Sequence, residues 1–215
     1  MRERPKMFAL VLKDWRNAKN SFYPSLLLGL PLILLLSFLD NRTNSNLLHQ
    51  NQLYWLIYFY SSISVFYRSF GFEHRFHNFH IYRSLDIAPW KVFVSQCVAH
   101  FGICLLIGLA YLIFIPIFWP TETWPMFELL ALTAAIAACQ TPIGCLLGLL
   151  LQFEREFLFA LFFLPIMTPL LLAASQLSEA FYPSWIYILT AFFLAGSFVS
   201  AMVFQFFFDE LTQSQ

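Results

Sequence analysis

The stretch FLFALFFLPIMTPLLLAASQL at residues 157–177 decides the fold class. It carries no ionisable side chain, and about 20 such apolar residues in a helix cross a hydrocarbon core of about 30 Å. The remainder of the 215-residue chain is similar, with 60% hydrophobic and 11% charged residues. Soluble domains carry roughly 25% charged residues, and disordered chains combine low hydrophobicity with high charge. The composition therefore excludes both classes and predicts a polytopic membrane protein.

Five further apolar runs lie between the charged residues. Together with residues 157–177, they predict six transmembrane helices at residues 23–39, 53–67, 92–119, 129–153, 157–177 and 185–208. The strands of a membrane barrel would alternate polar and apolar side chains, and these runs do not. We expect an all-α fold in which residues 1–215 form a single transmembrane domain.

The basic residues predict how the helices are oriented. Eleven of the twelve Lys and Arg precede the first run, separate the second from the third, or separate the fourth from the fifth. Only Arg42 falls on the opposite side, where Glu122, Glu128 and Glu179 lie instead. Because basic residues concentrate in cytoplasmic loops, we expect both termini to be cytoplasmic.

Two cytoplasmic segments have helical periodicity. Within residues 1–20, apolar side chains recur at Phe8, Val11, Leu12 and Trp15. This pattern predicts a helix lying in the membrane interface, and the alternative is a solvated basic N-terminus that only fixes topology.

The second segment, residues 68–91, is a predicted coupling loop. Its Phe72, Phe76 and Phe79 share one helical face, and Glu73, His77 and His80 follow one position later. Such a helix can dock into a groove on a soluble partner, or it can cover the ends of its own bundle.

No metal site is expected. His74, His77 and His80 are three residues apart, so successive side chains turn by about 60° and do not converge. His100 inside the third run is interpreted as a neutral side chain hydrogen-bonded to a neighbouring helix, although ionisable groups in membranes are often functional. The four cysteines all fall within predicted spans and are interpreted as packing residues.

Backbone-breaking residues suggest hinges in the fourth and fifth runs. Pro165 and Pro169 remove two successive helical hydrogen bonds. Pro142 precedes Gly144 and Gly148, whose spacing lets another helix approach closely. Ordinary packing and a static kink are the alternative interpretations.

The sequence contains no catalytic motif. It lacks a phosphate-binding loop, a nucleophile elbow and an HExxH zinc motif, and no Asp, Glu, Lys or Arg lies inside a predicted span. We therefore expect a non-enzymatic membrane subunit whose energy comes from another polypeptide, with no catalytic residues, no resident cofactor and no nucleic-acid partner.

Four segments resemble those of a known family. Lys13-Asp14-Trp15-Arg16 is similar to a Lys-Asp-x-Arg motif, and residues 69–73 (SFGFE) are similar to Ser-Phe-x-x-Glu. Residues 141–144 (TPIG) and 164–174 (LPIMTPLLLAA) resemble Gly-Thr-x-Gly and Leu-Pro-x-x-x-Pro-x-Leu-Ile-Ala-Ala. These are motifs of the haem exporter protein B family (CcmB), the permease subunit of the cytochrome c maturation ABC transporter. The chain departs from that family at residues 74–80, which replace an acidic, Gly-containing run, and at Asp86, where a proline is expected.

The resemblance implies a type-2 ABC exporter permease in a bacterial inner membrane. It implies four kinds of partner besides membrane lipid: an ATP-binding ATPase subunit, a haem-handling membrane subunit, a small single-span subunit and a periplasmic haem chaperone. Haem would be handled by the complex, with two permease chains or a permease pair in it. The residues that would couple to the ATPase are Phe70, Phe72, Glu73, Phe76, His77, Phe79, His80 and Arg83.

Two other functions fit the sequence. One is a type-2 ABC permease for a different substrate, such as a glycan, a lipid or a drug. The other is an assembly scaffold that holds the haem-handling subunits together without a transport path.

Overall fold

The computed structural model describes residues 7–43, 50–75, 82, 84, 87–118, 126–150, 156–179 and 183–213. This part of the chain forms six helices: α1 (Met7–Thr43), α2 (Gln50–Arg75), α4 (Pro89–Phe118), α5 (Met126–Leu150), α6 (Glu156–Glu179) and α7 (Pro183–Gln213). The described ranges contain no strand. The predicted all-α fold class is confirmed.

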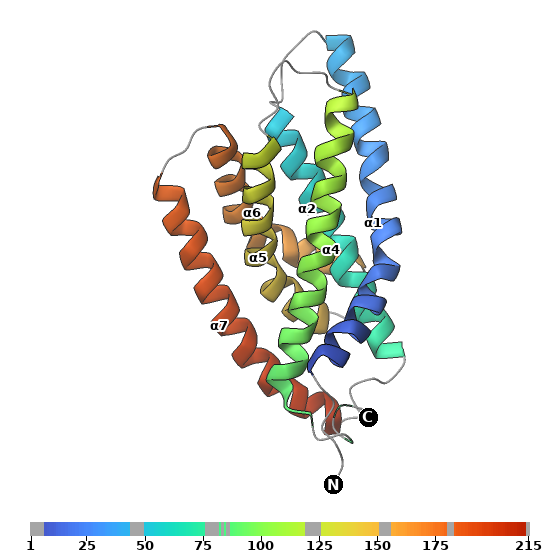
Figure 1. The fold of residues 1–215 in the computed structure, drawn as a ribbon, viewed down its shortest axis with the longest axis vertical. Coiled ribbons are helices and arrows are strands. Elements are labelled where there is room, and N and C mark those ends of the chain that lie inside the picture. The colour runs from blue at the N-terminus through green and yellow to red at the C-terminus, as the bar shows by residue number, and fades with distance from the viewer. Residues whose placement is uncertain are drawn as a thin grey trace.

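The helices run alternately up and down the long axis of the bundle (Figure 1). As a result, the start of α1 and the end of α7 lie at the same end, together with the end of α2 and the start of α4. We call this the terminal end of the bundle. In the described part of the chain, α2, α4 and α5 are central, and α7 packs on α4, α5 and α6 along one side.

Five of the helices are long and apolar enough to cross a membrane: Met7–Leu35, Pro89–Phe118, Met126–Leu150, Leu158–Glu179 and Ser184–Phe208. They define a multi-pass membrane protein, as the composition predicts. The predicted second span, residues 53–67, lies within α2, which is not among the five. Its Ser, Tyr, Gln and Asn side chains lower its hydropathy, and most of residues 53–66 are buried against α1, α4, α5 and α6.

The N-terminal segment differs from the prediction. The predicted interfacial helix at residues 1–20 has no boundary of its own in the described residues, because α1 continues from Met7 to Thr43 as one helix of 37 residues, about 55 Å long. Phe8 is 75% exposed, but Trp15 packs against Gly102 of α4. The buried side of α1 is a stripe of mostly short side chains that allow close helix approach: Leu10, Asp14, Ala18, Ser21, Ser25, Gly29 and Ile33.

The predicted cytoplasmic loop is also shorter than expected. Helix α2 continues through residue 75, and α4 begins at Pro89 rather than residue 92. Phe70, Phe72 and Glu73 therefore belong to the last turns of α2, not to a separate loop helix. The other predicted coupling residues lie outside the described part of the chain: Phe76, His77, Phe79, His80 and Arg83.

Candidate functional site

A buried carboxylate lies at the terminal end of the bundle. Asp14 is only 2% exposed because it belongs to the inward-facing stripe of α1. Its Oδ2 accepts a hydrogen bond from the hydroxyl of Ser95 on α4, and its Oδ1 lies 3.5 Å from the Tyr82 hydroxyl, which donates to it. A charge in this position is stable only when it is paired and hydrogen-bonded, and both conditions are met here.

Lys13 completes the cluster from the neighbouring position on α1. Its Nζ lies 3.1 Å from Asp14 Oδ1, donates to the Tyr82 hydroxyl and lies 4.3 Å from the centroid of the Tyr82 ring. The Lys13 side chain is 35% exposed, against 1% for Asp14, so the ammonium group lies between the carboxylate and the surface. We refer to Lys13, Asp14, Tyr82 and Ser95 as the junction.

The junction holds three segments together. Tyr82 is buried, and its carbonyl accepts a hydrogen bond of 3.0 Å from the backbone N–H of Ile87, shortly before α4 begins. Tyr82 is therefore attached to α1 through Lys13 and Asp14, and Ser95 attaches the same Asp14 to α4. Movement of Tyr82 would be transmitted to both helices.

Sequence reasoning found only half of the junction. Lys13 and Asp14 were noted through the family resemblance, but Tyr82 and Ser95 were missed. A buried partner for Asp14 could have been suspected, because Asp14 falls on the same helical face as Leu10 and Ala18.

A second cluster of interest surrounds the ring of Phe66 on α2. The ring stacks on His100 of α4, with centroids 5.5 Å apart and planes 14° apart, and lies 5.8 Å from the ring of Phe163 on α6. On α5, a Cβ atom at Gly144 would come within 2.6 Å of the Phe66 ring. Phe66 thus contacts residues on three other helices. The spacing of Gly144 and Gly148 suggests close approach of another helix backbone, but the space beside Gly144 is filled by the Phe66 ring.

The imidazole of His100 hydrogen-bonds within its own helix. Its Nδ1 lies 2.7 Å from the carbonyl oxygen of Gln96, one turn earlier on α4. The contact with the neighbouring helix α2 is the ring stacking on Phe66. This bond stays within α4, whereas the sequence interpretation places the hydrogen bond on a neighbouring helix.

The predicted hinge residues divide between the inside and the outside of the bundle. Pro142 and Gly148 are buried in α5, whereas Pro165 and Pro169 are exposed on α6. Helix α6 nevertheless continues from Glu156 to Glu179, and the buried face of α6 is formed by other residues, including Phe163 and Met167. The structure therefore does not bring the two pairs of predicted hinge residues together.

Hydroxyl and amide groups on α2 form a polar seam that the sequence reading missed. The cross-helix pairs in the middle of α2 are Tyr54–Thr133 at 2.6 Å, Ser61–Tyr111 at 2.7 Å, Tyr58–Gln140 at 2.8 Å and Ser62–Gln140 at 3.3 Å. All of these residues are buried. The enrichment of Ser and Tyr in residues 54–64 was the available signal, and these bonds fix α2 against α4 and α5.

The described residues offer no obvious place for a metal. They contain no group of three or more His, Cys, Asp or Glu side chains that could hold an ion. The four cysteines, all in described helices, form no disulfide, and Cys104, Cys139 and Cys145 are buried in the helix core. Of the three clustered histidines, His77 and His80 lie outside the described residues.

The fold and these clusters define a helical, multi-pass membrane protein. Comparison of the chain with protein-family models, curated proteins and solved structures gives no match. Any more specific function is therefore inferred from the residues themselves.

Proposed function

We propose that this chain is the membrane permease subunit of an ABC transporter complex that handles or exports haem in cytochrome c biogenesis. ATP would be hydrolysed by a separate ATPase subunit, since the sequence has no phosphate-binding loop. The other partners would be a haem-handling membrane subunit, a small single-span subunit and a periplasmic haem chaperone. Haem is the cargo of the complex in this proposal, not a cofactor of this chain.

The junction is the observation that carries the proposal. Lys13 and Asp14, which belong to the motif that resembles haem exporter protein B, hold Tyr82 at the end of the predicted coupling segment. An ATPase that pushed or pulled this segment would act on α1 and α4 through Tyr82 and Ser95. A rigid connection of this kind is what a permease needs to convert movement of a soluble partner into movement of its helices.

The arrangement of the helices supports the same proposal. If α2 is the sixth span, each helix crosses the membrane once and both ends of the chain lie on one side. Lys13 lies near the start of α1, Arg68 near the end of α2 and Lys91 near the start of α4, which all belong to the terminal end. Glu128 near the start of α5 and Glu179 at the end of α6 belong to the other end. By the positive-inside rule, the terminal end faces the cytoplasm of a bacterial inner membrane, where an ATPase can reach it.

Helix α2 can cross the membrane despite its lower hydropathy. Its polar groups face α4 and α5, where they form the hydrogen bonds of the seam instead of contacting lipid. The described side chains of α2 that are exposed in its middle, Leu56 and Tyr60, are apolar or amphipathic. When apolar helices cover the polar side of a helix, only its remaining, lipid-facing side needs to be apolar.

Co-purification with an ATPase tests this function. We expect a tagged form of this chain, co-expressed with an ABC ATPase encoded beside it, to retain that ATPase in detergent. Phe76→Asp should abolish retention, because a few large apolar residues dominate such interfaces, whereas Phe76→Leu should preserve it. The amount of each variant in membranes reports whether it inserts normally.

Two results would count against the proposal. Failure of the wild-type chain to retain any co-expressed ATPase would contradict the ABC assignment. Undiminished retention by Phe76→Asp would show that the predicted apolar stripe covers the bundle instead of docking the partner.

A further inference from the structure

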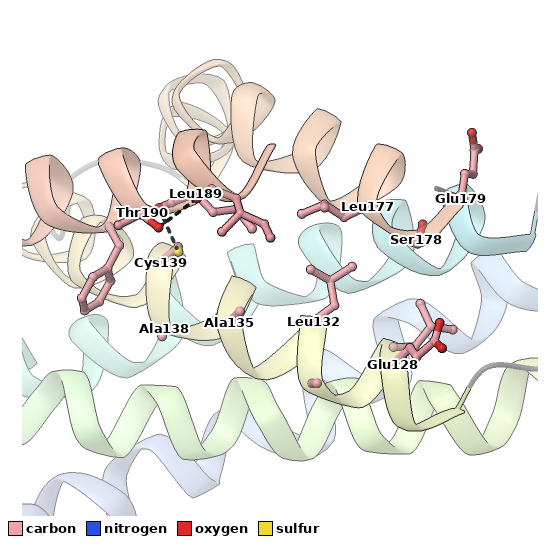
Figure 2. A pocket seen from close by; sticks show the side chains of 14 residues that line it. Glu128, Leu132, Ala135, Ala138, Cys139, Leu177, Ser178, Glu179, Leu189 and Thr190 are labelled. Carbon is pink, nitrogen blue, oxygen red and sulfur yellow. Dashed lines mark hydrogen bonds between the residues drawn. The ribbon is translucent and has the colours of Figure 1, made fainter. Parts of the chain in front are cut away.

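A mainly apolar groove of about 780 Å³ lies between α5, α6 and α7, at the end of the bundle opposite the terminal end. Figure 2 shows its floor on α5, where Ala135 and Ala138 lie beside the longer Leu132, with the last turns of α6 and the first turns of α7 above it. The floor includes Ala131, Ala135 and Ala138, and the walls include Leu177, Leu189 and Phe193.

The polar side chains inside the groove are already paired with backbone carbonyls. Thr190 donates to the Ile186 carbonyl at 2.8 Å, and the Cys139 thiol lies 3.7 Å from the Leu189 carbonyl. Ser178 likewise donates to the Ser175 carbonyl at 2.7 Å. The body of the groove therefore suits an apolar occupant, because these donors are used within the protein.

The groove is as deep as one leaflet of a bilayer. Along α5 it runs from Glu128 to Cys139, which is about 16 Å at 1.5 Å per residue, or about half of the hydrocarbon thickness. Below this level α7 meets α5, and a Cβ atom at Gly196 would come within 2.8 Å of Ile143. A transmembrane helix needs the full thickness, so a groove closed at mid-depth fits a lipid chain better than a partner helix.

The mouth of the groove is acidic. Among the described residues, the lining includes the exposed Glu128 and Glu179 and contains no Lys or Arg. One oxygen of Glu179 accepts a hydrogen bond of 2.8 Å from Gln52, which fixes that carboxylate near the end of α6. Carboxylates at this position attract an ammonium group and repel a phosphate-only head group or the propionates of haem.

We propose that this groove binds one acyl chain of a membrane lipid whose head group carries an ammonium group, as phosphatidylethanolamine does. The chain would enter from the leaflet opposite the terminal end, with the ammonium group beside Glu128 and Glu179. This inference depends on the groove alone and holds whether or not the chain is an ABC permease.

Native mass spectrometry of the purified full chain tests the proposal. Detergent-solubilised protein is titrated with phosphatidylethanolamine or phosphatidylglycerol of identical acyl chains. We expect retention of phosphatidylethanolamine at several-fold lower concentration than phosphatidylglycerol. Glu128→Gln combined with Glu179→Gln should remove this preference, since it removes both mouth charges.

Filling the groove should remove the tightly bound lipid itself. Ala135→Trp places an indole on the floor, whereas Ala195→Trp places the same group on an exposed position of α7 outside the lining. Only the first should lose the lipid. Ala138→Leu is a smaller filling variant, in case Ala135→Trp elutes as an aggregate in gel filtration. Equal retention of the two lipids by the wild type, or wild-type retention by a folded groove-filling variant, would overturn the proposal.

Discussion

The hydroxyl of Ser95 donates a hydrogen bond to the carboxylate of Asp14, joining α4 to α1 between residues 81 positions apart. Both side chains are buried. Because of this contact, the first turns of α1 belong to the bundle instead of lying free on the membrane surface. Asp14 also accepts a hydrogen bond from Tyr82, so the same carboxylate contacts a residue that precedes α4 in the chain.

Replacing the carboxylate should weaken the bundle. We expect Asp14→Ala to lower the free energy of unfolding by about 1.5–3 kcal/mol, because hydrogen bonds to a buried charge contribute that much and Lys13 loses its counter-ion. The shift is measured as the temperature at which the detergent-solubilised protein is lost from its gel-filtration peak. Lys19→Ala, at an exposed position on the same helix, serves as the control and should leave it unchanged. Equal thermal stability of Asp14→Ala and wild type would mean that the junction does not hold the helices together.

The contact between Phe66 and Gly144 gives a second stability prediction. A methyl group at position 144 would lie 2.6 Å from the ring, so Gly144→Ala should cost about 1–3 kcal/mol as the ring is displaced. Phe66→Leu leaves a smaller side chain there and should absorb part of that cost. In a double-mutant cycle, the double variant should therefore lose less unfolding free energy than the two single variants lose together. Strict additivity would show that the ring and the glycine do not constrain each other.

Most of the helices could be predicted because long apolar runs are a strong signal. The predicted spans at residues 92–119 and 185–208 fall within a few residues of α4 and α7, respectively. The full length of α1 could not be predicted, because periodicity marks the faces of a helix but not its end. Pro24 and Pro31, which could have suggested breaks, lie inside the continuous helix.

The candidate site was harder to predict, for a different reason. Tyr82 and Ser95 meet Asp14 only after α1 and α4 have packed side by side, and no local pattern encodes contacts across 68 and 81 positions. The polar seam of α2 lowered its hydropathy and concealed its place at the centre of the bundle. The polarity of α2 could be read from the sequence, but the helices that accept or donate its hydrogen bonds could not.

The orientation of the bundle can be measured by cysteine labelling. In a variant whose four native cysteines are replaced by Ala, single cysteines are introduced at Glu122, Glu179 and Arg68. We expect a membrane-impermeant maleimide added to spheroplasts to label positions 122 and 179 but not position 68, because the basic end should be cytoplasmic. Labelling after membrane disruption controls for accessibility. The reverse pattern would invert the orientation.

The exposed proline pair of α6 offers a test of flexibility. Pro165→Ala with Pro169→Ala restores two backbone N–H donors and should stiffen the helix, while the core stays unchanged because neither proline is buried. If α6 bends during the ATPase cycle, the double variant should assemble normally but support less cytochrome c maturation. Ala195→Ser, an exposed substitution on α7, provides the control. Normal maturation by the double variant would reduce the pair to a static feature of α6.

Haem staining of c-type cytochromes in a strain that lacks this gene tests the proposed function most directly. The strain is compared with one that carries the wild-type gene on a plasmid, under conditions that require c-type cytochromes. We expect covalently attached haem to fall strongly in the deletion strain and to return with the plasmid, while the apocytochromes are still synthesised. Unchanged haem staining in the deletion strain would contradict a role in cytochrome c biogenesis.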